Sequence, residues 1–320
     1  MRVALIGFGH EARSVYWPVL HENRDLQGAV SDPALTTNAA TLEAEKLGVR
    51  VFAAPLTLFH EFQPGMAIIS ATPSAHYGLL SQAVECGVPA VCDKPLLISP
   101  QELQTLEKQF RRRSVELRFV NNWEYSQQFS MFKAEVARIR WDPNQTVHLT
   151  FEFQRPLPSD VAGWRFSPTC GGVAWEYGWH AIYLARKMLS SFRADNAAFP
   201  ARPSRVRIRH RDLFHSEFSF SYAAMDVMVR AVRGDLPRRT LLICAQDDRT
   251  VALLDDKLTR MSQGKKAILE IAAPPLPNPE SRTHWFRAMT AEGLLKQEAA
   301  EASRAEARDC LRVLQDVYPI

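Results

Sequence analysis

The sequence predicts two domains of different fold class: an N-terminal α/β domain with a doubly wound parallel sheet, and a C-terminal α+β domain with a mostly antiparallel open sheet. The chain has 320 residues, more than a single hydrophobic core usually serves. Short apolar strands alternate with helical patterns up to about residue 122, and strand-rich segments follow. The expected domains are residues 1–122 and 123–320, and a last helix at about 302–318 is expected to pack back on the N-terminal domain.

The first domain reads as a series of βαβ units. The expected strands are 2–6, 27–31, 49–52, 66–70, 89–92 and 115–120, and the expected helices are 11–22, 39–47, 75–86 and 100–112. The last of these helices opens with Ser99-Pro100-Gln101-Glu102, a capping box with proline at the first helical position. Strands that alternate with helices of this length form a parallel sheet.

The second domain is richer in strands. These are expected at 146–155, 205–210, 217–222, 227–232, 240–245, 250–254 and 266–271, with one long helix at 174–189 between them. Hairpin-like spacing of this kind predicts an antiparallel sheet with helices on one side. A proline-rich linker at 273–279 and helices from about 282 to 318 complete the chain.

Composition and charge exclude several classes of protein. The net charge is +4, and the arginine clusters at 111–113 and 207–211 lack the interleaved aromatic residues of a nucleic-acid surface. The second cluster alternates as one exposed strand face would. Five widely spaced cysteines fit neither a disulfide framework nor a zinc site, and predict a reduced, cytoplasmic chain. No segment reaches the about 20 apolar residues that span a bilayer, and the histidines show no metal-ligand spacing.

A glycine-rich fingerprint joins the first strand to the first helix. It comprises Gly7, Phe8, Gly9, His10, Glu11 and Ala12. In this context Gly7 permits a tight turn, Gly9 lets the backbone approach a pyrophosphate, and Ala12 allows close packing of helix on strand. Asp32 ends the second strand, where a carboxylate accepts hydrogen bonds from an adenosine ribose and repels a 2′-phosphate. The pattern predicts a dinucleotide cofactor, NAD in preference to NADP.

Two later segments also follow strands, at the sheet edge where such folds bind ligands. They run from Ala71, Thr72 and Pro73 to His76, and from Asp93 and Lys94 to Pro95. A third segment contains Trp164-Arg165 and then a glycine-rich run that leads through Glu176 and Tyr177 to His180. Together with the fingerprint, these segments resemble the signatures of the Gfo/Idh/MocA oxidoreductase family, over nearly the whole chain.

The resemblance implies an N-terminal Rossmann domain, a nicotinamide cofactor and a C-terminal substrate domain. It implies that His180 is the general acid/base on the substrate, and that the Lys94 ammonium stabilises a developing alkoxide. The implied cofactor contacts are the fingerprint residues, Asp32, Ala71, Thr72, Pro73, His76, Asp93, Lys94 and Asn122. The implied substrate contacts are Lys94, Trp123, Trp164, Arg165, Glu176, Tyr177 and His180.

The chain departs from the family pattern at several acidic positions. Asp93 stands where glutamate is usual, Glu176 where aspartate is usual, Tyr183 at the place of a frequent second aspartate, and Cys170 at the first glycine of the run. The loss of an acid at Tyr183 removes an acceptor for sugar hydroxyls. Aromatic residues, Trp123, Tyr125, Trp164, Trp175, Tyr177 and Trp179, gather in the same segments, where they either line a pocket or form core.

We therefore expect a dehydrogenase or reductase that acts on a C–OH/C=O or a C=N centre of a small metabolite. A sugar or polyol and a biosynthetic intermediate both remain open as substrates. Two other functions remain open: a hydrolase that uses NAD for transient oxidation and elimination, and a nucleotide-binding sensor or scaffold without catalysis. The resemblance also implies a homodimer or homotetramer formed through the C-terminal sheet, with no nucleic acid or membrane as a partner.

Overall fold

The computed structural model describes residues 1–36, 48–121, 123, 126–142, 144–157, 166–167, 170–192, 203–222, 225–255, 257–262, 265–270 and 297–319. The chain divides into two compact units: unit 1 holds residues 1–122 and 279–307, and unit 2 holds residues 123–278 and 308–320. The helix expected at 39–47 and the proline-rich segment at 273–279 lie outside the described residues.

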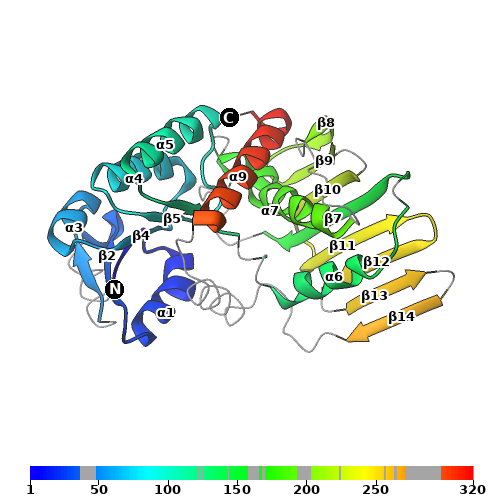
Figure 1. Ribbon diagram of the computed structural model, residues 1–320, viewed down its shortest axis with the longest axis horizontal. Coiled ribbons are helices and arrows are strands. Elements are labelled where there is room, and N and C mark those ends of the chain that lie inside the picture. The colour runs from blue at the N-terminus through cyan, green and yellow to red at the C-terminus, as the bar shows by residue number, and fades with distance from the viewer. Residues whose placement is uncertain are drawn as a thin grey trace. The chain divides into compact units, whose positions relative to one another are not determined.

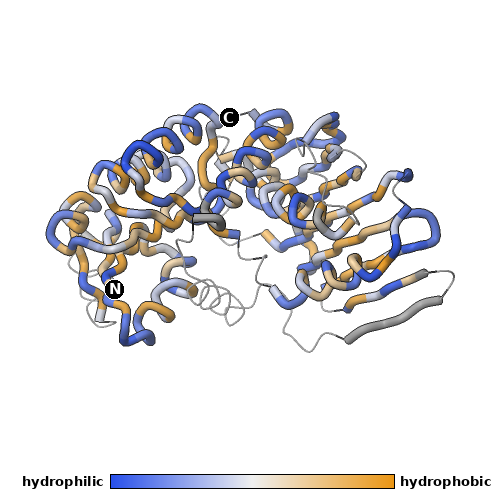
Figure 2. The backbone as a smooth tube through the Cα atoms, in the orientation of Figure 1, coloured by the Kyte–Doolittle hydropathy of each residue, from blue (hydrophilic) through white to orange (hydrophobic). Residues whose placement is uncertain are grey.

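Unit 1 is built on a six-stranded parallel sheet with the order β3-β2-β1-β4-β5-β6 (Figure 1). Its strands are β1 (Arg2–Ile6), β2 (Gln27–Ser31), β3 (Arg50–Phe52), β4 (Met66–Ile69), β5 (Ala90–Cys92) and β6 (Leu117–Phe119). This order, which reverses between β1 and β4, is that of a doubly wound sheet. Figure 2 shows hydrophobic residues gathered on these strands, and those of β4 and β5 are completely buried. The predicted fold class of the first domain is confirmed.

The helices of unit 1 follow the predicted alternation with two differences. They are α1 (Trp17–Glu22), α3 (Pro55–Phe62), α4 (Pro73–Glu85) and α5 (Pro100–Arg113), with a short 3-10 helix at Pro33–Thr36. The helix expected at 11–22 contains a π-helical turn, Ala12–Tyr16, ahead of α1. Helix α3 was not predicted, because its buried residues Leu58, Phe59 and Phe62 fill barely two turns.

The N-cap of α5 forms at Ser99, as the sequence predicts. The Glu102 N–H donates to Ser99 Oγ at 3.4 Å, and Pro100 occupies the first helical turn. The three arginines at 111–113 lie in the last turn, where cations interact favourably with the helix dipole.

Unit 2 contains an eight-stranded sheet with the order β14-β13-β12-β11-β7-β10-β9-β8. Its strands are β7 (Val147–Pro156), β8 (Ser204–Arg211), β9 (His215–Tyr222), β10 (Met225–Gly234), β11 (Arg239–Gln246), β12 (Arg249–Leu254), β13 (Lys257–Ser262) and β14 (Lys265–Glu270). Neighbouring strands are antiparallel except for β7 and β10, which are parallel. The predicted mostly antiparallel sheet is confirmed, and β13 is an additional strand.

Two helices of unit 2 pack on this sheet. Helix α7 (Gly172–Met188) contacts β7, β9 and β10, and α6 (Gln127–Ala137), which was not predicted, contacts β12 and β13. A 3-10 helix, Leu189–Phe192, follows α7, and α9 (Gln297–Val317) closes the chain. Residues 297–307 of α9 group with unit 1 and residues 308–317 with unit 2.

The arginine cluster at 207–211 differs from its predicted form. The sequence predicts a strand with one exposed face, but nearly every residue of β8 is exposed. β8 is an edge strand that pairs with β9 on one side only, so its other side has no neighbouring strand and its residues are exposed.

Candidate functional site

The glycine-rich turn after β1 lies at the reversal of strand order in unit 1, between the neighbours β2 and β4. Doubly wound sheets bind ligands at this point. Gly7 has a φ of +89°, and a Cβ there would lie 2.7 Å from the Ser70 carbonyl oxygen, so only glycine fits. At Gly9 a Cβ would meet nothing within 4 Å. The turn is therefore tight, and its backbone is open to the close approach that a phosphate requires.

Asp32, which follows β2, holds the turn in place. Its Oδ2 accepts the Phe8 N–H at 2.6 Å, and its Oδ1 accepts the Ala34 N–H at 2.7 Å. A carboxylate has about four acceptor sites, so two remain for the hydroxyl groups of a ligand. The structure thus brings the predicted residues Phe8 and Asp32 together, with spare acceptor capacity beside the turn.

A cluster of titratable groups follows β5. Asp93 Oδ1 accepts the backbone N–H of Lys94 at 2.7 Å. Burial of the carboxyl group, and then the negative charge of Glu11, raise the pKa of Asp93 to about 6, while Lys94 lowers it. Burial, and then the charge of Asp93, raise the pKa of Tyr16 well above its ordinary value. Glu11, Asp93 and Lys94 are predicted site residues that the fold gathers, and Tyr16 is a member that the sequence did not indicate.

His76 is completely buried at the start of α4. Its Nδ1 lies 2.9 Å from the Pro95 oxygen and 3.0 Å from the Leu96 oxygen, and its Nε2 lies 3.0 Å from the Ala71 oxygen. Burial lowers the pKa of His76, and the hydrogen bonds to these carbonyls act against that shift. The ring therefore ties the segment after β4 to the turn that carries Lys94. A contact of His76 with a cofactor stays a prediction.

In unit 2, four aromatic side chains form a continuous row that includes His180. The ring of Trp123 lies 5.7 Å from that of His180 and 5.5 Å from that of Phe153, and Phe153 stacks on Tyr177 at 5.4 Å. His180 and Tyr177 lie on α7, one turn apart, and Phe153 lies on β7. The structure thus brings together three of the predicted substrate contacts.

The row ends at an ion pair that the sequence analysis did not find. Arg233 donates from Nε and Nη2 to the two carboxylate oxygens of Glu176, at 3.0 and 2.7 Å, and from Nη2 to the Tyr177 hydroxyl at 2.7 Å. The side chains of Arg233 and Glu176 are 12% and 11% exposed. Burial lowers the pKa of Arg233, but the hydrogen bond to Glu176 and its charge outweigh burial and raise it. Glu176, a predicted substrate contact, is thus held by a cation.

Other predicted residues have different surroundings. Trp175 and Trp179 are buried and stack on each other at 6.4 Å, and Trp175 Nε1 donates to the Tyr318 oxygen at 3.1 Å, so both belong to the core of unit 2. Tyr183 is buried, with the Lys187 ammonium 5.2 Å from its ring centre. Asn122, Tyr125, Trp164 and Arg165 lie outside the described residues.

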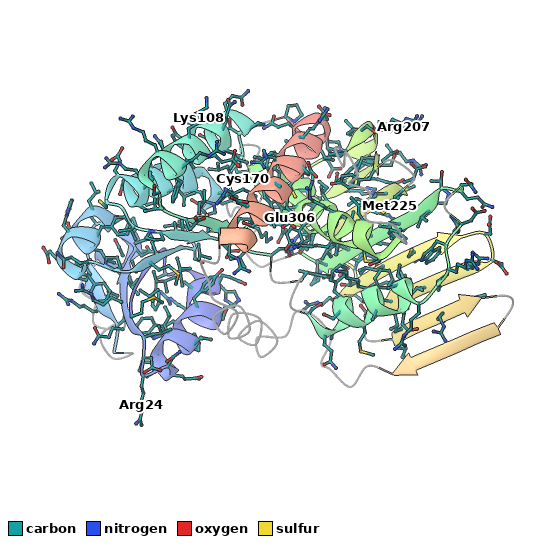
Figure 3. The ribbon with its side chains drawn as sticks, viewed as in Figure 1. Arg24, Lys108, Cys170, Arg207, Met225 and Glu306 are labelled. Atoms are coloured by element: carbon teal, nitrogen blue, oxygen red, sulfur yellow. The ribbon has the colours of Figure 1, made fainter. Side chains whose placement is uncertain are left out.

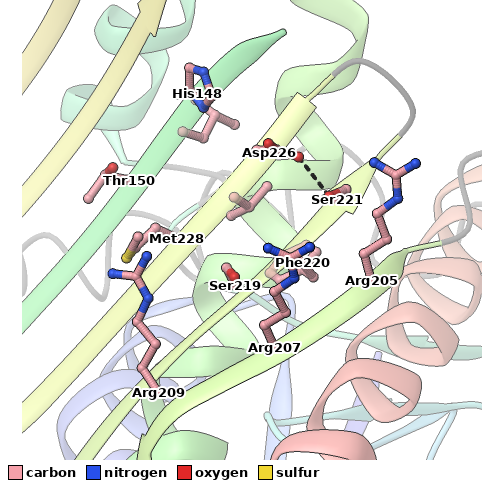
Figure 4. A pocket seen from close by; sticks show the side chains of 12 residues that line it. His148, Thr150, Arg205, Arg207, Arg209, Ser219, Phe220, Ser221, Asp226 and Met228 are labelled. Carbon is pink, nitrogen blue, oxygen red and sulfur yellow. Dashed lines mark hydrogen bonds between the residues drawn. The ribbon is translucent and has the colours of Figure 1, made fainter.

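A separate pocket of about 370 Å³ lies on the C-terminal sheet (Figure 4). Its lining includes Arg205, Arg207 and Arg209 of β8, and Ser221, whose hydroxyl donates to Asp226 at 2.6 Å. Across the ranges that the structure describes, no group of three His, Cys, Asp or Glu residues is arranged to hold a metal ion. In the same ranges no helix is long and apolar enough to cross a membrane.

Comparison with known proteins agrees with this geometry. Residues 1–120 match the sequence model of a family described as "Oxidoreductase family, NAD-binding Rossmann fold". No curated protein matches the chain in sequence.

Solved structures of similar fold cover almost the whole chain. The 3-ketoreductase KijD10 from Actinomadura kijaniata, in complex with NADP and TDP-benzene, has a TM-score of 0.78 at 13% identity, over 99% of this chain and 97% of its own. An oxidoreductase from Agrobacterium radiobacter, in complex with NAD+, L-tartaric acid and magnesium, has a TM-score of 0.76 at 15% identity, over 99% and 95%. UDP-N-acetylglucosamine 3-dehydrogenase from Acidithiobacillus ferrooxidans has a TM-score of 0.72 at 15% identity, over 99% and 96%. At such identities the likeness establishes the fold.

Proposed function

Because residues 1–120 belong to the Gfo/Idh/MocA oxidoreductase family, with its NAD-binding Rossmann fold, we propose that this chain is an NAD(P)-dependent dehydrogenase or reductase. Its reaction would transfer a hydride between nicotinamide and a C–OH/C=O or C=N centre of a small metabolite. The observation that carries the proposal is the turn at Gly7 and Gly9, which is closed on one side by the Ser70 backbone, open on the other, and held by Asp32.

The residues at this turn fit the dinucleotide. Backbone N–H groups at the start of a helix bind phosphate oxygens, and the open backbone at Gly9 leaves room for a pyrophosphate. The two remaining acceptor sites of Asp32 suit the two hydroxyls of an adenosine ribose, and its charge would repel a 2′-phosphate. We therefore favour NAD over NADP.

Lys94 and His180 carry the chain's own share of the chemistry in this proposal. When bound, the nicotinamide supplies the donor or acceptor of the hydride. The Lys94 ammonium would donate a hydrogen bond to the substrate oxygen as negative charge develops there. The His180 imidazole would take the proton from the substrate hydroxyl during oxidation and return it during reduction, since imidazole exchanges protons near neutral pH.

The assembly and compartment belong to the same proposal. We propose a homodimer or homotetramer formed through the C-terminal sheet, in the cytoplasm. The five cysteines, all within the described residues, form no disulfide with one another, which supports a reducing compartment. One of the solved structures of similar fold is a UDP-N-acetylglucosamine 3-dehydrogenase, which keeps a sugar derivative among the candidate substrates.

Cofactor titration tests the proposal directly. We expect NADH to quench tryptophan fluorescence with energy transfer to the reduced nicotinamide, and to bind more tightly than NADPH. Asp32→Ala should weaken NADH binding and remove the preference for NADH over NADPH. Asp25→Ala, an exposed position that also loses one carboxylate, is the matched control and should bind like the parent. If neither nucleotide binds, the oxidoreductase proposal is wrong.

A further inference from the structure

We propose that the end of the aromatic row in unit 2 is a subsite for an anionic group of the substrate, a carboxylate or a phosphate, bound by Arg155 and Arg233. The inference rests on the proposed function, because it names the class of substrate for the site that holds His180. The main observation behind the inference is that these two arginines lie next to each other.

The two arginines are direct neighbours in the sheet. Arg233 of β10 and Arg155 of β7 are Cα partners in the parallel register of these strands. Arg155 shares the buried face of β7 with Phe151 and Phe153, and is itself only 6% exposed. Like charges placed directly opposite each other destabilise a sheet. A pair of arginines with so little exposure to solvent is therefore stable only if a negative charge lies near it.

The residues that the structure describes supply only part of that charge. Arg233 is paired with Glu176, as described above. Arg155 donates to the Gln154 and Arg239 carbonyls at 2.8 and 2.7 Å and to Thr240 Oγ1 at 2.9 Å, all of them neutral oxygens. No carboxylate within the described part of the chain forms an ion pair with it. Among the described residues, the two guanidinium groups thus share one carboxylate at ion-pair distance, that of Glu176, while the charge of Asp255 acts on Arg155 without an ion pair.

The electrostatics of Arg155 show the same imbalance. Burial lowers the pKa of Arg155, the charge of Arg233 lowers it further, and Tyr177, Glu176 and Asp255 act against these effects. Removing a cation from water is unfavourable unless an opposite charge accompanies it. Electrostatic strain of this kind is typical of functional sites.

The surroundings suit recognition of an anion next to the reacting centre. Both guanidinium carbons lie near the Tyr177 ring, at 5.5 Å for Arg155 and 5.4 Å for Arg233, and Arg233 also lies 5.6 Å from the Phe166 ring centre. Tyr177 connects through Phe153 and Trp123 to His180. Planar guanidinium groups bind carboxylates and phosphates with matched geometry. If the anionic group of a substrate binds the two arginines, the rest of that substrate would lie along the row of rings and extend toward His180.

Titration of the full-length protein with simple anions tests the inference. The probes are inorganic phosphate and malonate, with sodium chloride at matched ionic strength, and the readouts are tryptophan fluorescence and the thermal midpoint. We expect a saturable response to phosphate or malonate that chloride does not give. A stronger response to phosphate indicates a phosphorylated substrate, and a stronger response to malonate indicates a carboxylic acid.

Variants assign the response to the arginines. Arg233→Gln should weaken anion binding at least tenfold, and Arg233→Lys, which keeps the charge without the two-pronged geometry, should weaken it less. Arg24→Gln is the matched control, since Arg24 is an exposed arginine of unit 1 that projects into solvent (Figure 3). It should bind the anion like the parent.

Two results would overturn the inference: no saturable response to either anion, or an equal response in the parent and in Arg233→Gln. NADH binding, measured on the same samples, separates the two proposals. If NADH binds normally but no anion response is seen, only the proposal of an anionic subsite is wrong. If an anion binds but neither NADH nor NADPH does, the oxidoreductase proposal is wrong and the anionic subsite stands.

Discussion

At the scale of single residues, the sequence predicted which residues lie near one another better than it predicted the partner of each side chain. Glu176, Tyr177 and His180 were predicted as site residues from one segment, and the structure places them on one helix, with Tyr177 and His180 in the row of rings. Arg155 and Arg233 were missed, although Arg155 continues the alternation of buried residues along β7, and the half-buried Arg233 lies two residues beyond Ala231, the last buried residue of β10. Alternation predicts which face a residue lies on, but only the register of β7 and β10 shows that the two arginines meet.

Replacement of the proposed catalytic residues separates chemistry from cofactor binding. We expect Lys94→Ala and His180→Ala each to lower turnover by orders of magnitude, because each removes a group that acts on the substrate oxygen in the transition state. The affinity for NADH should change little. Steady-state kinetics and fluorescence titration on the same samples check this. A variant that keeps the full rate would show that its residue has another role.

The titration of Asp93 should be visible in stability. Its pKa is about 6 against an ordinary value of 3.8, so the folded state binds this proton more tightly than the unfolded state. The stabilising contribution is complete below pH 3.8 and is lost as the pH rises through 6. The variant Asp93→Asn should not lose stability in this way, because asparagine does not titrate.

Urea denaturation at pH 4.5 and 7.5 measures this effect. The free energy of unfolding of Asp93→Asn, relative to the parent, should be higher at pH 7.5 than at pH 4.5, by on the order of 1 kcal/mol. Asp25→Asn controls for the loss of one exposed carboxylate. The same relative value at both pH values would contradict the assignment.

At the scale of elements, the sequence predicted those with a strong period or a clear cap. Strands β1 and β2 begin and end at the predicted residues, and α5 begins at Pro100, directly after its N-cap Ser99. Helices α3 and α6 and strand β13 escaped prediction. Helix α6 buries the polar Gln128 and Glu135 along with its apolar residues, so its pattern is not that of a simple amphipathic helix. The pairing of β13 between β12 and β14, rather than any local pattern, defines that strand.

The start of α7 depends on glycine. Gly172 has a φ of +56°, and a Cβ there would lie 2.5 Å from the backbone oxygen of Leu213. Gly172→Ala should therefore lower the free energy of unfolding by about 2 kcal/mol or more. Gly78→Ala is the control, because Gly78 lies exposed in α4 and a Cβ there would meet nothing within 4 Å. It should raise stability by up to about 1 kcal/mol, since alanine is the better helix former. Thermal unfolding of both variants tests the contrast.

At the scale of the whole molecule, the proposed assembly through the C-terminal sheet is open to direct measurement. We expect the mass in solution to be that of a dimer or a tetramer at micromolar concentration. A charge reversal, Arg207→Glu, on the side of the sheet that holds the pocket of Figure 4 should shift the mass toward the monomer. Light scattering after size-exclusion chromatography measures the mass of the parent chain and of Arg207→Glu. Arg24→Glu, a charge reversal in unit 1, is the control. A parent chain that is monomeric throughout this range would refute the assembly.

The parallel pairing of β7 with β10 also bears on how the protein folds. Antiparallel neighbours such as β11 and β12 are joined by a two-residue turn and can pair early. Strands β7 and β10, in contrast, are separated in the chain by α7, β8 and β9, so closing this contact costs much more chain entropy. Arg155 and Arg233 face each other only across this late-closing pair. A chain whose sheet is incompletely assembled therefore has no paired arginines, so the number of anion-binding sites per chain would measure the fraction of molecules that have completed folding.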